Sequence, residues 1–164
     1  MPLPIDWSKL TARDVLDIAA YIEAEAQERY ELFAAHLDRR GESEAAGFFR
    51  HMAELEGAHG AQVSERRRVR FADLPASVRD AVEWDVEGPA LDRSAATLTT
   101  ERAFELALAS EERARDFFAE ASEHLADEAT AAVLAELHRD EISHVALLHH
   151  IRSSLAVPGT PLVY

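Results

Sequence analysis

The sequence predicts an all-α fold, a four-helix bundle made of two antiparallel helical hairpins that a long crossover joins. The first observation is composition: Ala, Glu, Leu and Arg dominate, whereas the 164 residues include only six glycines and six prolines. The second is connectivity, because four long helical stretches are separated by two short links and one long segment. Apolar residues make up 48% of the chain, which is enough to bury a core between the helices.

The first hairpin is expected to contain helices over about residues 12–40 and 43–70. Asp14 follows Thr11 by three residues, a spacing typical of a capping box at a helix N-terminus. Gly41 suits the position after the helix end, where the backbone often turns left-handed. Because only a few residues link the two helices, they are expected to be antiparallel neighbours.

The second hairpin is expected to contain helices over about residues 100–125 and 128–156. The third helix begins after Thr99, and Asp127 is a good N-cap for the fourth. Pro158 marks the end of the fourth helix, since proline does not continue a helix. The link between these helices is again short, which predicts a second antiparallel pair.

The connection between the hairpins, over about residues 71–98, is roughly 28 residues long. A segment of this length can cross the whole bundle, so that the second hairpin starts at the opposite end. Two hairpins and one long crossover are the connectivity of ferritin-like bundles. We therefore expect residues 1–164 to form a single domain of this kind.

Charge and composition exclude several functional classes. The formal net charge of −14 argues against nucleic-acid binding, which needs clustered Lys and Arg. The chain has no cysteine, which excludes thiol catalysis, disulfides and cysteine-held metal clusters. No apolar run approaches the about 18 residues of a membrane span, and the N-terminus does not resemble a signal peptide. We expect a cytoplasmic protein that binds neither nucleic acid nor membranes.

A faint internal repeat relates the two predicted hairpins. Residues 23–37 resemble residues 111–125, with aromatic side chains at the equivalent positions Tyr30 and Phe118. The second helix of each hairpin carries a Glu-x-x-His pair, namely Glu56/His59 and Glu141/His144. The chain therefore looks like two copies of one helical hairpin.

Carboxylates interrupt the apolar face of every predicted helix. Residues three or four positions apart share a helix face, and each apolar face contains one glutamate among small, aliphatic and aromatic residues. On the second and fourth helices a histidine follows that glutamate by three residues. The six polar residues on the core faces are Glu23, Glu56, His59, Glu111, Glu141 and His144.

Four carboxylates in one core need a counter-charge. Burying an ionised carboxylate alone is costly, and no Lys or Arg lies on these faces. Protonation would relieve the cost, and two divalent cations would do so better. Two glutamates plus two Glu-x-x-His pairs form the general pattern that holds a di-iron or di-manganese pair in a bundle core. We predict that the six residues bind two metal ions, iron first, with manganese or zinc as alternatives.

Several neighbouring residues are expected to lie outside this metal site. One Glu-x-x-His is more often a solvated pair than a metal site, so the prediction depends on two copies with matching glutamates. Glu25, Glu54 and Glu112 fall off the core faces and are not expected to coordinate. Tyr30 and Phe118 are expected to pack in the core rather than act as radical sites. The remaining histidines are expected at the surface, at helix ends or otherwise away from the six ligands: His36, His51, His124, His138, His149 and His150.

On these residues the sequence resembles the rubrerythrin branch of the ferritin-like superfamily. The resemblance lies in the stretches EAEAQERY, FFRHMAELEGAH, EERARDFF and LAELHRDEISH, and it covers all four predicted helices. It implies two bridging glutamates, two terminal glutamates and one histidine per metal: Glu56 and Glu141, Glu23 and Glu111, and His59 and His144, respectively.

The chain departs from the rubrerythrin pattern in two ways. Typical members carry a rubredoxin domain with a four-cysteine iron centre, which a chain without cysteine cannot form. They also tend to have an additional glutamate one turn after the terminal ligand of the third helix, where this chain has Ala114. Electrons would then come from an external donor protein, or the physiological reaction would be ferrous oxidation.

The leading functional hypothesis is a redox enzyme that reduces peroxide or dioxygen at the paired metals, with no separate catalytic side chain. A ferroxidase or iron-handling protein is the alternative. A metal-free structural bundle and a substrate oxygenase are further hypotheses, and the metal content of the protein separates the first of these from the rest.

Self-association is expected, most simply as a homodimer. Part of the reason is the resemblance. The other part is that Leu16, Ile22 and Leu32 of the first helix fall off its core face, so that another surface would have to cover them.

Overall fold

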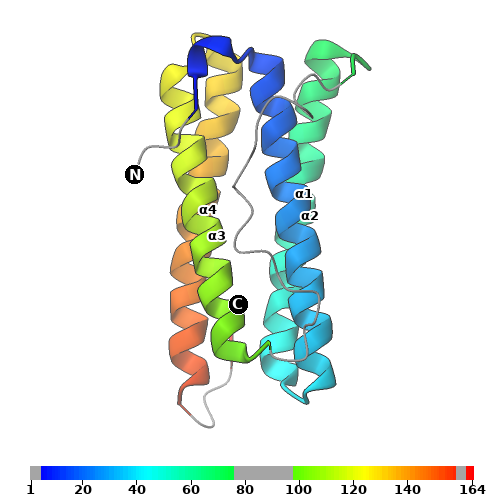
Figure 1. The fold of residues 1–164 in the computed structure, drawn as a ribbon, viewed down its shortest axis with the longest axis vertical. Helices are drawn as coiled ribbons and strands as arrows, with labels where there is room; N and C mark the ends of the chain where they lie inside the picture. The colour runs from blue at the N-terminus through cyan, green and yellow to red at the C-terminus, as the bar shows by residue number, and fades with distance from the viewer. Residues whose placement is uncertain (1–4, 76–97, 158–161) are drawn as a thin grey trace.

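Four long helices make up most of the computed structural model, which describes residues 5–75, 98–157 and 162–164. A short 3-10 helix precedes them, and the elements are η1 (Trp7–Lys9), α1 (Ala12–Arg39), α2 (Ser43–Phe71), α3 (Thr100–His124) and α4 (Glu128–Leu155). No strand occurs in the described ranges. As Figure 1 shows, α1 packs along α2 and α3 packs along α4, which is the predicted pair of antiparallel hairpins.

Capping side chains explain where the helices begin. The backbone N–H of Asp14 donates to Thr11 Oγ1 at 3.2 Å, and the Thr11 N–H donates to Asp14 Oδ2 at 2.8 Å, a complete capping box. Thr99 and Asp127 each accept from the backbone N–H three residues later, at 3.2 Å and 2.8 Å. Gly41 has a φ of 78° and turns the chain from α1 into α2. Every helix end lies within one residue of its predicted position.

Within each hairpin the two helices run in opposite directions, while α2 and α3, on either side of the crossover, do not (Figure 1). In Figure 1, α2 ends near one end of the molecule and α3 begins near the other. The two helices therefore run in the same direction, as the predicted topology requires. The crossover expected over residues 71–98 lies mostly outside the described residues, so its path and the single domain over residues 1–164 stay predictions.

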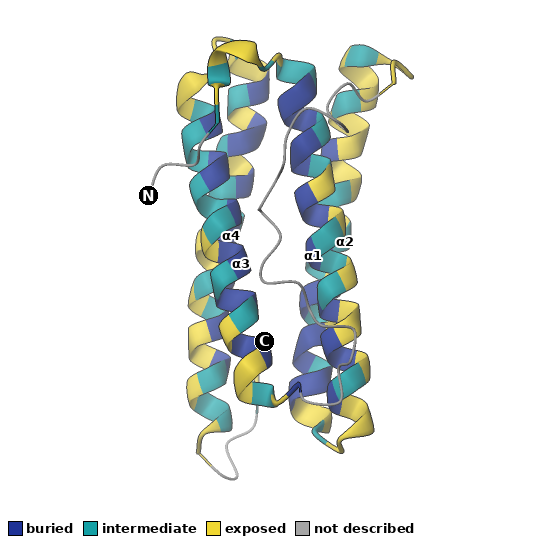
Figure 2. Cartoon of the chain, in the orientation of Figure 1, coloured by how far each residue is buried: buried dark blue, intermediate teal, exposed yellow. Residues whose placement is uncertain are grey.

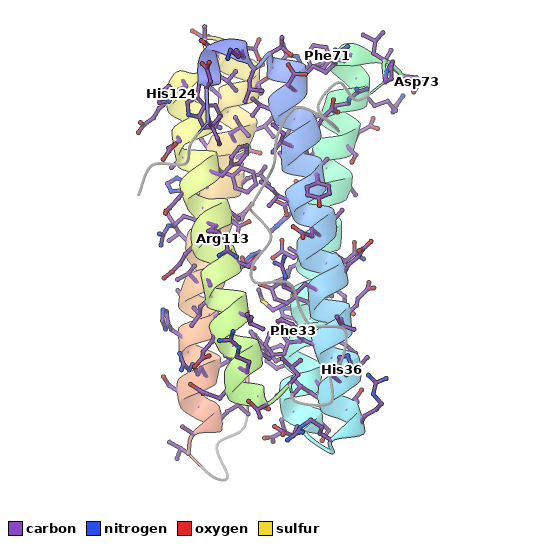
Figure 3. All side chains as sticks on the ribbon, viewed as in Figure 1. Phe33, His36, Phe71, Asp73, Arg113 and His124 are labelled. Atoms are coloured by element: carbon purple, nitrogen blue, oxygen red, sulfur yellow. The ribbon has the colours of Figure 1, made fainter. Side chains whose placement is uncertain are left out.

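Two apolar clusters fill the interior, one in each half of the bundle. The first contains the C-terminal half of α1 and the N-terminal half of α2, and its largest side chains are Tyr30, Phe33, Phe48, Phe49 and Phe104. The second lies in the other half, and its largest side chains are Leu16, Phe117, Phe118 and Leu134. Figure 2 shows buried residues along the facing sides of the helices, and Figure 3 shows Phe33 between the two hairpins.

One expectation about the first helix was wrong. Leu16 and Ile22 were expected to need cover from another surface, but they are 0% and 5% exposed within this chain. The reason is that α1 packs against both α2 and α3, which buries a wider part of its circumference than one stripe. Leu32 alone of the three stays exposed, at 38%. The homodimer therefore remains a prediction without support from Leu16 and Ile22.

The basic run at the end of α2 forms ion pairs within the chain. Arg67 pairs with Asp17 of α1 at 2.7 Å, and Arg70 donates to Asp127 at the start of α4 at 2.8 Å. The Arg70 guanidinium also lowers the pKa of Asp127, which keeps this N-cap ionised. In the portion of the chain that is described, no helix is long and apolar enough to cross a membrane.

Candidate metal centre

A band of polar side chains lies between the two apolar clusters, at mid-length of the bundle. Every helix contributes, and the members are Glu23 of α1, Glu56 and His59 of α2, Glu111 of α3, and Glu141 and His144 of α4. All four glutamates are buried, with exposed fractions of 1–2%. The structure thus brings together all six residues that the sequence pattern selected, because each lies on the core face of its own helix.

His144 is surrounded by carboxylates. Its Nδ1 atom lies 2.9 Å from Glu56 Oε1, 3.2 Å from Glu111 Oε2 and 3.6 Å from Glu141 Oε2. These four side chains place one ligand atom each within 4.8 Å of one another. These three carboxylate oxygens and one imidazole nitrogen come from α2, α3 and α4, and they lie close enough together to contact a single metal ion.

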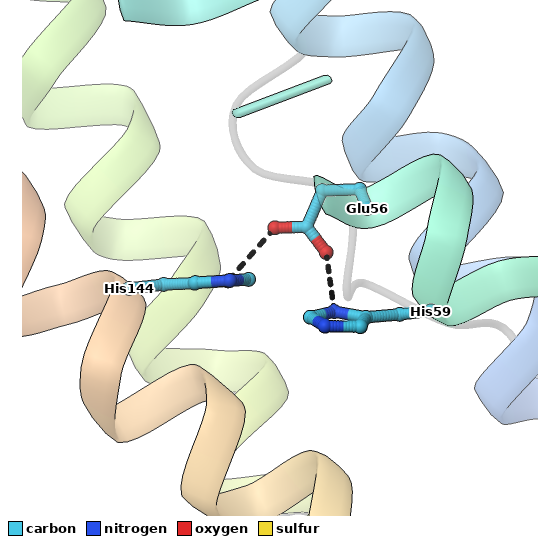
Figure 4. Close-up of side chains that lie close together, drawn as sticks. All are labelled: Glu56, His59 and His144. Carbon is cyan, nitrogen blue, oxygen red and sulfur yellow. Dashed lines mark ion pairs between the residues drawn. The ribbon is translucent and has the colours of Figure 1, made fainter. Parts of the chain in front are cut away.

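His59 occupies the other side of the band. Its Nδ1 atom lies 3.6 Å from Glu23 Oε2 and 3.7 Å from Glu56 Oε2. Its ring stacks on that of His144, with 5.3 Å between centroids and 18° between planes. Figure 4 shows Glu56 between the two histidines, with one carboxylate oxygen directed at each ring. That is the arrangement a carboxylate needs in order to bridge two ions.

Burial and ion pairing shift the pKa values of the cluster. Burial raises the pKa of Glu23 to about 8 and that of Glu141 well above its ordinary value. Burial also acts on Glu56, but contacts with His144 and His59 outweigh it and lower the pKa of Glu56 to about 2. Contacts with Glu23 and Glu56 raise the pKa of His59 to about 10, and three carboxylates raise the pKa of His144 against the effect of burial.

These shifts identify the counter-charge of the metal-free protein. The sequence shows no Lys or Arg on the core faces, and protonation was considered there only as relief for the carboxylates. The raised pKa values of the two histidines favour protonated imidazoles, which would pair with the carboxylates around them. A metal ion would take over that positive charge and would have to displace a proton from each histidine.

The donor atoms of the band fit a pair of divalent cations. Within the described residues, five buried atoms of the cluster make no hydrogen bond: Glu23 Oε1, Glu23 Oε2, Glu56 Oε1, His59 Nδ1 and Glu141 Oε2. Buried polar atoms in proteins are nearly always hydrogen-bonded, so such a concentration is unusual. All five can offer a lone pair to a cation when deprotonated, and carboxylate plus imidazole suits iron, manganese and zinc. The residues present can therefore hold two such ions.

Tyr30 makes a functional contact that the sequence pattern did not predict. Its ring is fully buried and stacks on Phe49, as expected for a core residue, but its hydroxyl also donates a hydrogen bond to Glu111 Oε1. Burial and the nearby Glu111 carboxylate raise the pKa of Tyr30, which keeps the phenol neutral and able to donate. No pattern within one helix predicts this contact, because it joins α1 to α3.

The residues that were expected outside the centre do lie outside it. Glu54 and Glu112 are exposed, and Glu25 is half-buried and pairs with Arg29 at 3.4 Å. His124, His149 and His150 are exposed, and His36 and His138 are half-buried. His51 differs from its expected position in solvent, because it is half-buried and its ring lies 5.1 Å from that of Tyr164. Among the described residues, the groups spaced to hold a metal draw only on the six-residue band.

Comparison with known proteins identifies the family. A family model for rubrerythrin matches residues 14–151. The chain belongs to the rubrerythrin family. The match runs from the first turn of α1 to near the end of α4, so this rubrerythrin domain includes the whole polar band. Family membership and the carboxylate–histidine cluster together indicate a metal site.

A solved structure supports the rubrerythrin fold. The crystal structure of an uncharacterized conserved protein from Magnetospirillum magnetotacticum MS-1, at 2.00 Å resolution, is 25% identical in sequence. The alignment covers 94% of this chain and 99% of that one, with a TM-score of 0.73. No curated protein matches this rubrerythrin-family chain.

Proposed function

We propose that this rubrerythrin-family protein is a non-haem di-iron, or mixed iron–manganese, oxidoreductase that reduces peroxide or dioxygen. The proposed ligands are Glu23, Glu56, His59, Glu111, Glu141 and His144. The observation that carries the proposal is the position of Glu56, a buried carboxylate whose two oxygens face two different histidines. Three more buried glutamates surround this pair, which supports a site for two ions rather than one.

The side chains have separate roles in this proposal. Glu56 and Glu141 would hold both ions, Glu23 and Glu111 would be terminal ligands, and each histidine would bind one ion. When bound, a pair of ferrous ions supplies two electrons, one from each ion, for cleavage of an O–O bond. Reduction of hydrogen peroxide to two waters also consumes two protons, and Tyr30 holds one at its hydroxyl beside Glu111. Apolar clusters lie on both sides of the band, and the four glutamates between them are buried.

Electrons must return to the ions after each turnover. The chain contains no cysteine and cannot hold a four-cysteine iron centre of its own, so an external donor protein is part of the proposal. We also propose that the protein acts in the cytoplasm, which a chain without cysteine fits, and that it forms a homodimer, as its resemblance to rubrerythrins implies.

A ferroxidase is the second candidate, and one observation favours it. Ala114, which is buried at 5% exposure, lies one turn after Glu111 where rubrerythrins tend to have another glutamate. A site that lacks this carboxylate is less adapted to repeated peroxide reduction. In the ferroxidase reaction ferrous iron is the substrate and dioxygen is the oxidant.

The two candidates differ in oxidant and in the fate of the iron. Metal-free protein is loaded anaerobically with two ferrous ions per chain and mixed in a stopped-flow instrument with peroxide or, in parallel, with dioxygen. Faster oxidation by peroxide, with iron retained, supports the peroxide reductase. Faster oxidation by dioxygen, with continued oxidation of added ferrous iron, supports the ferroxidase. Failure to bind iron, or binding without reaction with either oxidant, would exclude both.

The exposed neighbour Glu112 provides a matched control for this experiment. Glu112→Ala should bind iron and react as the unchanged protein does, because its side chain lies in solvent. Glu111→Ala, one position earlier in α3, should lose a ligand from the buried cluster. The pair of variants therefore separates the loss of a ligand from a general effect of altering α3.

A further inference from the structure

The two halves of the proposed centre are not equivalent, although the internal repeat relates them. Glu23 and Glu111 occupy equivalent positions of the repeat, and Tyr30 and Phe118 follow them by seven residues. Tyr30 donates its hydroxyl hydrogen bond to Glu111, across from α1 to α3. The equivalent residue Phe118 is fully buried and has no hydroxyl to offer in the reverse direction. Only one of the two terminal glutamates, Glu111, therefore receives a hydrogen bond from a hydroxyl at this position of the repeat.

The two terminal carboxylates differ accordingly in how they are held. Glu111 accepts from Tyr30 at one oxygen, and its other oxygen lies 3.2 Å from His144 Nδ1 in a hydrogen bond. Both oxygens of Glu23 are buried, and neither makes a hydrogen bond to any described residue. Its ion pair with His59 is loose, at 3.6 Å. Glu111 is therefore fixed before any ion binds, whereas Glu23 is not.

The histidines show the same difference. His144 has three carboxylates within 3.6 Å of its Nδ1 atom, and its side chain is 6% exposed. His59 has Glu23 and Glu56 at 3.6 Å and 3.7 Å from its Nδ1 atom and Asp140 at 3.7 Å from its Nε2 atom, so all its carboxylate contacts are long, and its side chain is 15% exposed. Of the two metal-spaced groups among the described residues, the four-residue one contains His144 but not His59 or Glu23, and the one with His59 has only three members, Glu56, His59 and His144. Ligand geometry is thus prepared on one side of the band and incomplete on the other.

We infer that the two metal positions differ in affinity, and that the first divalent cation binds at Glu56, Glu111, Glu141 and His144. The second cation, at the position of Glu23 and His59, binds more weakly and exchanges with solvent. The physical reason is that the second ion must order Glu23 and draw His59 inward, whereas the first enters a position whose ligands are already in place. The inference rests on the proposed dinuclear centre and adds the order in which it fills.

Titration of the metal-free protein with Co²⁺ tests the order of filling. Bound metal is measured by equilibrium dialysis, and the visible absorption of Co²⁺ reports the coordination of each ion. Two steps are expected, with dissociation constants up to about tenfold apart, the effect of ordering one more long side chain. Glu23→Gln should remove the weaker step and keep the tighter one, whereas Glu111→Gln should weaken the tighter step. Far-ultraviolet circular dichroism verifies that each variant keeps its helices.

Two substitutions that remove or add one hydroxyl group test why the two affinities differ, and neither alters a proposed ligand. Tyr30→Phe should weaken the tighter step, whereas Phe118→Tyr, which adds a hydroxyl at the equivalent position, should tighten the weaker one. Two ions bound with equal affinity would overturn the inference and leave the proposed function intact. Loss of the tighter step in Glu23→Gln, with the weaker step retained, would also overturn it. Binding of no Co²⁺ would refute the dinuclear centre itself.

Discussion

The metal-free protein should become less stable as pH rises from about 6 to about 8. Burial raises the pKa of Glu23 from 4.5 to about 8, and its carboxylate partners raise the pKa of His59 from 6.5 to about 10. A group with a raised pKa in the folded state stabilises the fold below its unfolded pKa. That stabilisation is lost as pH rises through the folded value, which for these two groups means the range from about 4.5 to about 10.

The size of the effect follows from proton counting. Each additional proton that the folded state holds relative to the unfolded state lowers stability by about 1.4 kcal/mol per pH unit. Glu23 and His59 contact each other and titrate as a pair, so we count one such proton for the pair between about pH 6 and about pH 8, which amounts to on the order of 3 kcal/mol. Glu56 contributes nothing in this interval, since its lowered pKa of about 2 leaves it ionised in both states. A change of this size is a large fraction of the stability of an ordinary domain.

Urea unfolding of chelator-treated protein, followed by circular dichroism at the two pH values, measures the difference by linear extrapolation. Glu23→Gln should reduce the dependence on pH, whereas the exposed control Glu112→Gln should leave it unchanged. Metal-loaded protein should show the opposite trend, because metal ions bind the deprotonated ligands. If the metal-free protein is as stable at about pH 8 as at about pH 6, the assignment of protonated groups to the buried band is wrong.

Three further outcomes are expected. Glu56→Ala and Glu141→Ala should each abolish dinuclear binding, measured as metal per chain, because each residue is proposed to touch both ions. The control Glu112→Ala should keep two ions per chain. Loss of metal in Glu112→Ala with retention in Glu56→Ala and Glu141→Ala would show that the helical register is wrong. Tyr30→Phe should destabilise the metal-free protein by about 1–3 kcal/mol in urea unfolding, because Glu111 Oε1 loses its buried donor; an unchanged midpoint would mean that the hydroxyl does not support Glu111. Light scattering at micromolar concentration should give twice the chain mass of 18.2 kDa, and a monomer would refute the dimer.

The amino-acid sequence by itself determined the helices and the faces they bury. Capping residues such as Thr11 and Asp127 set the helix starts through bonds that span only three residues. The spacing of Glu56 and His59, and of Glu141 and His144, places each pair on one side of its own helix. Both signals are local, so they could be read before any helix was placed beside another, and together with the repeat they selected all six members of the band.

Only the tertiary structure decided what those faces touch. The burial of Leu16 and Ile22 depends on α1 having two neighbours, and the bond from Tyr30 to Glu111 depends on how α1 and α3 are rotated towards each other. The charge of His59 depends on carboxylates from three different helices, those of Glu23, Glu56 and Asp140, lying within 4 Å of it. Side-chain contacts and pKa values change steeply over a few ångströms, and the helix-to-helix distances that set them are not encoded in the spacing of residues along any one helix.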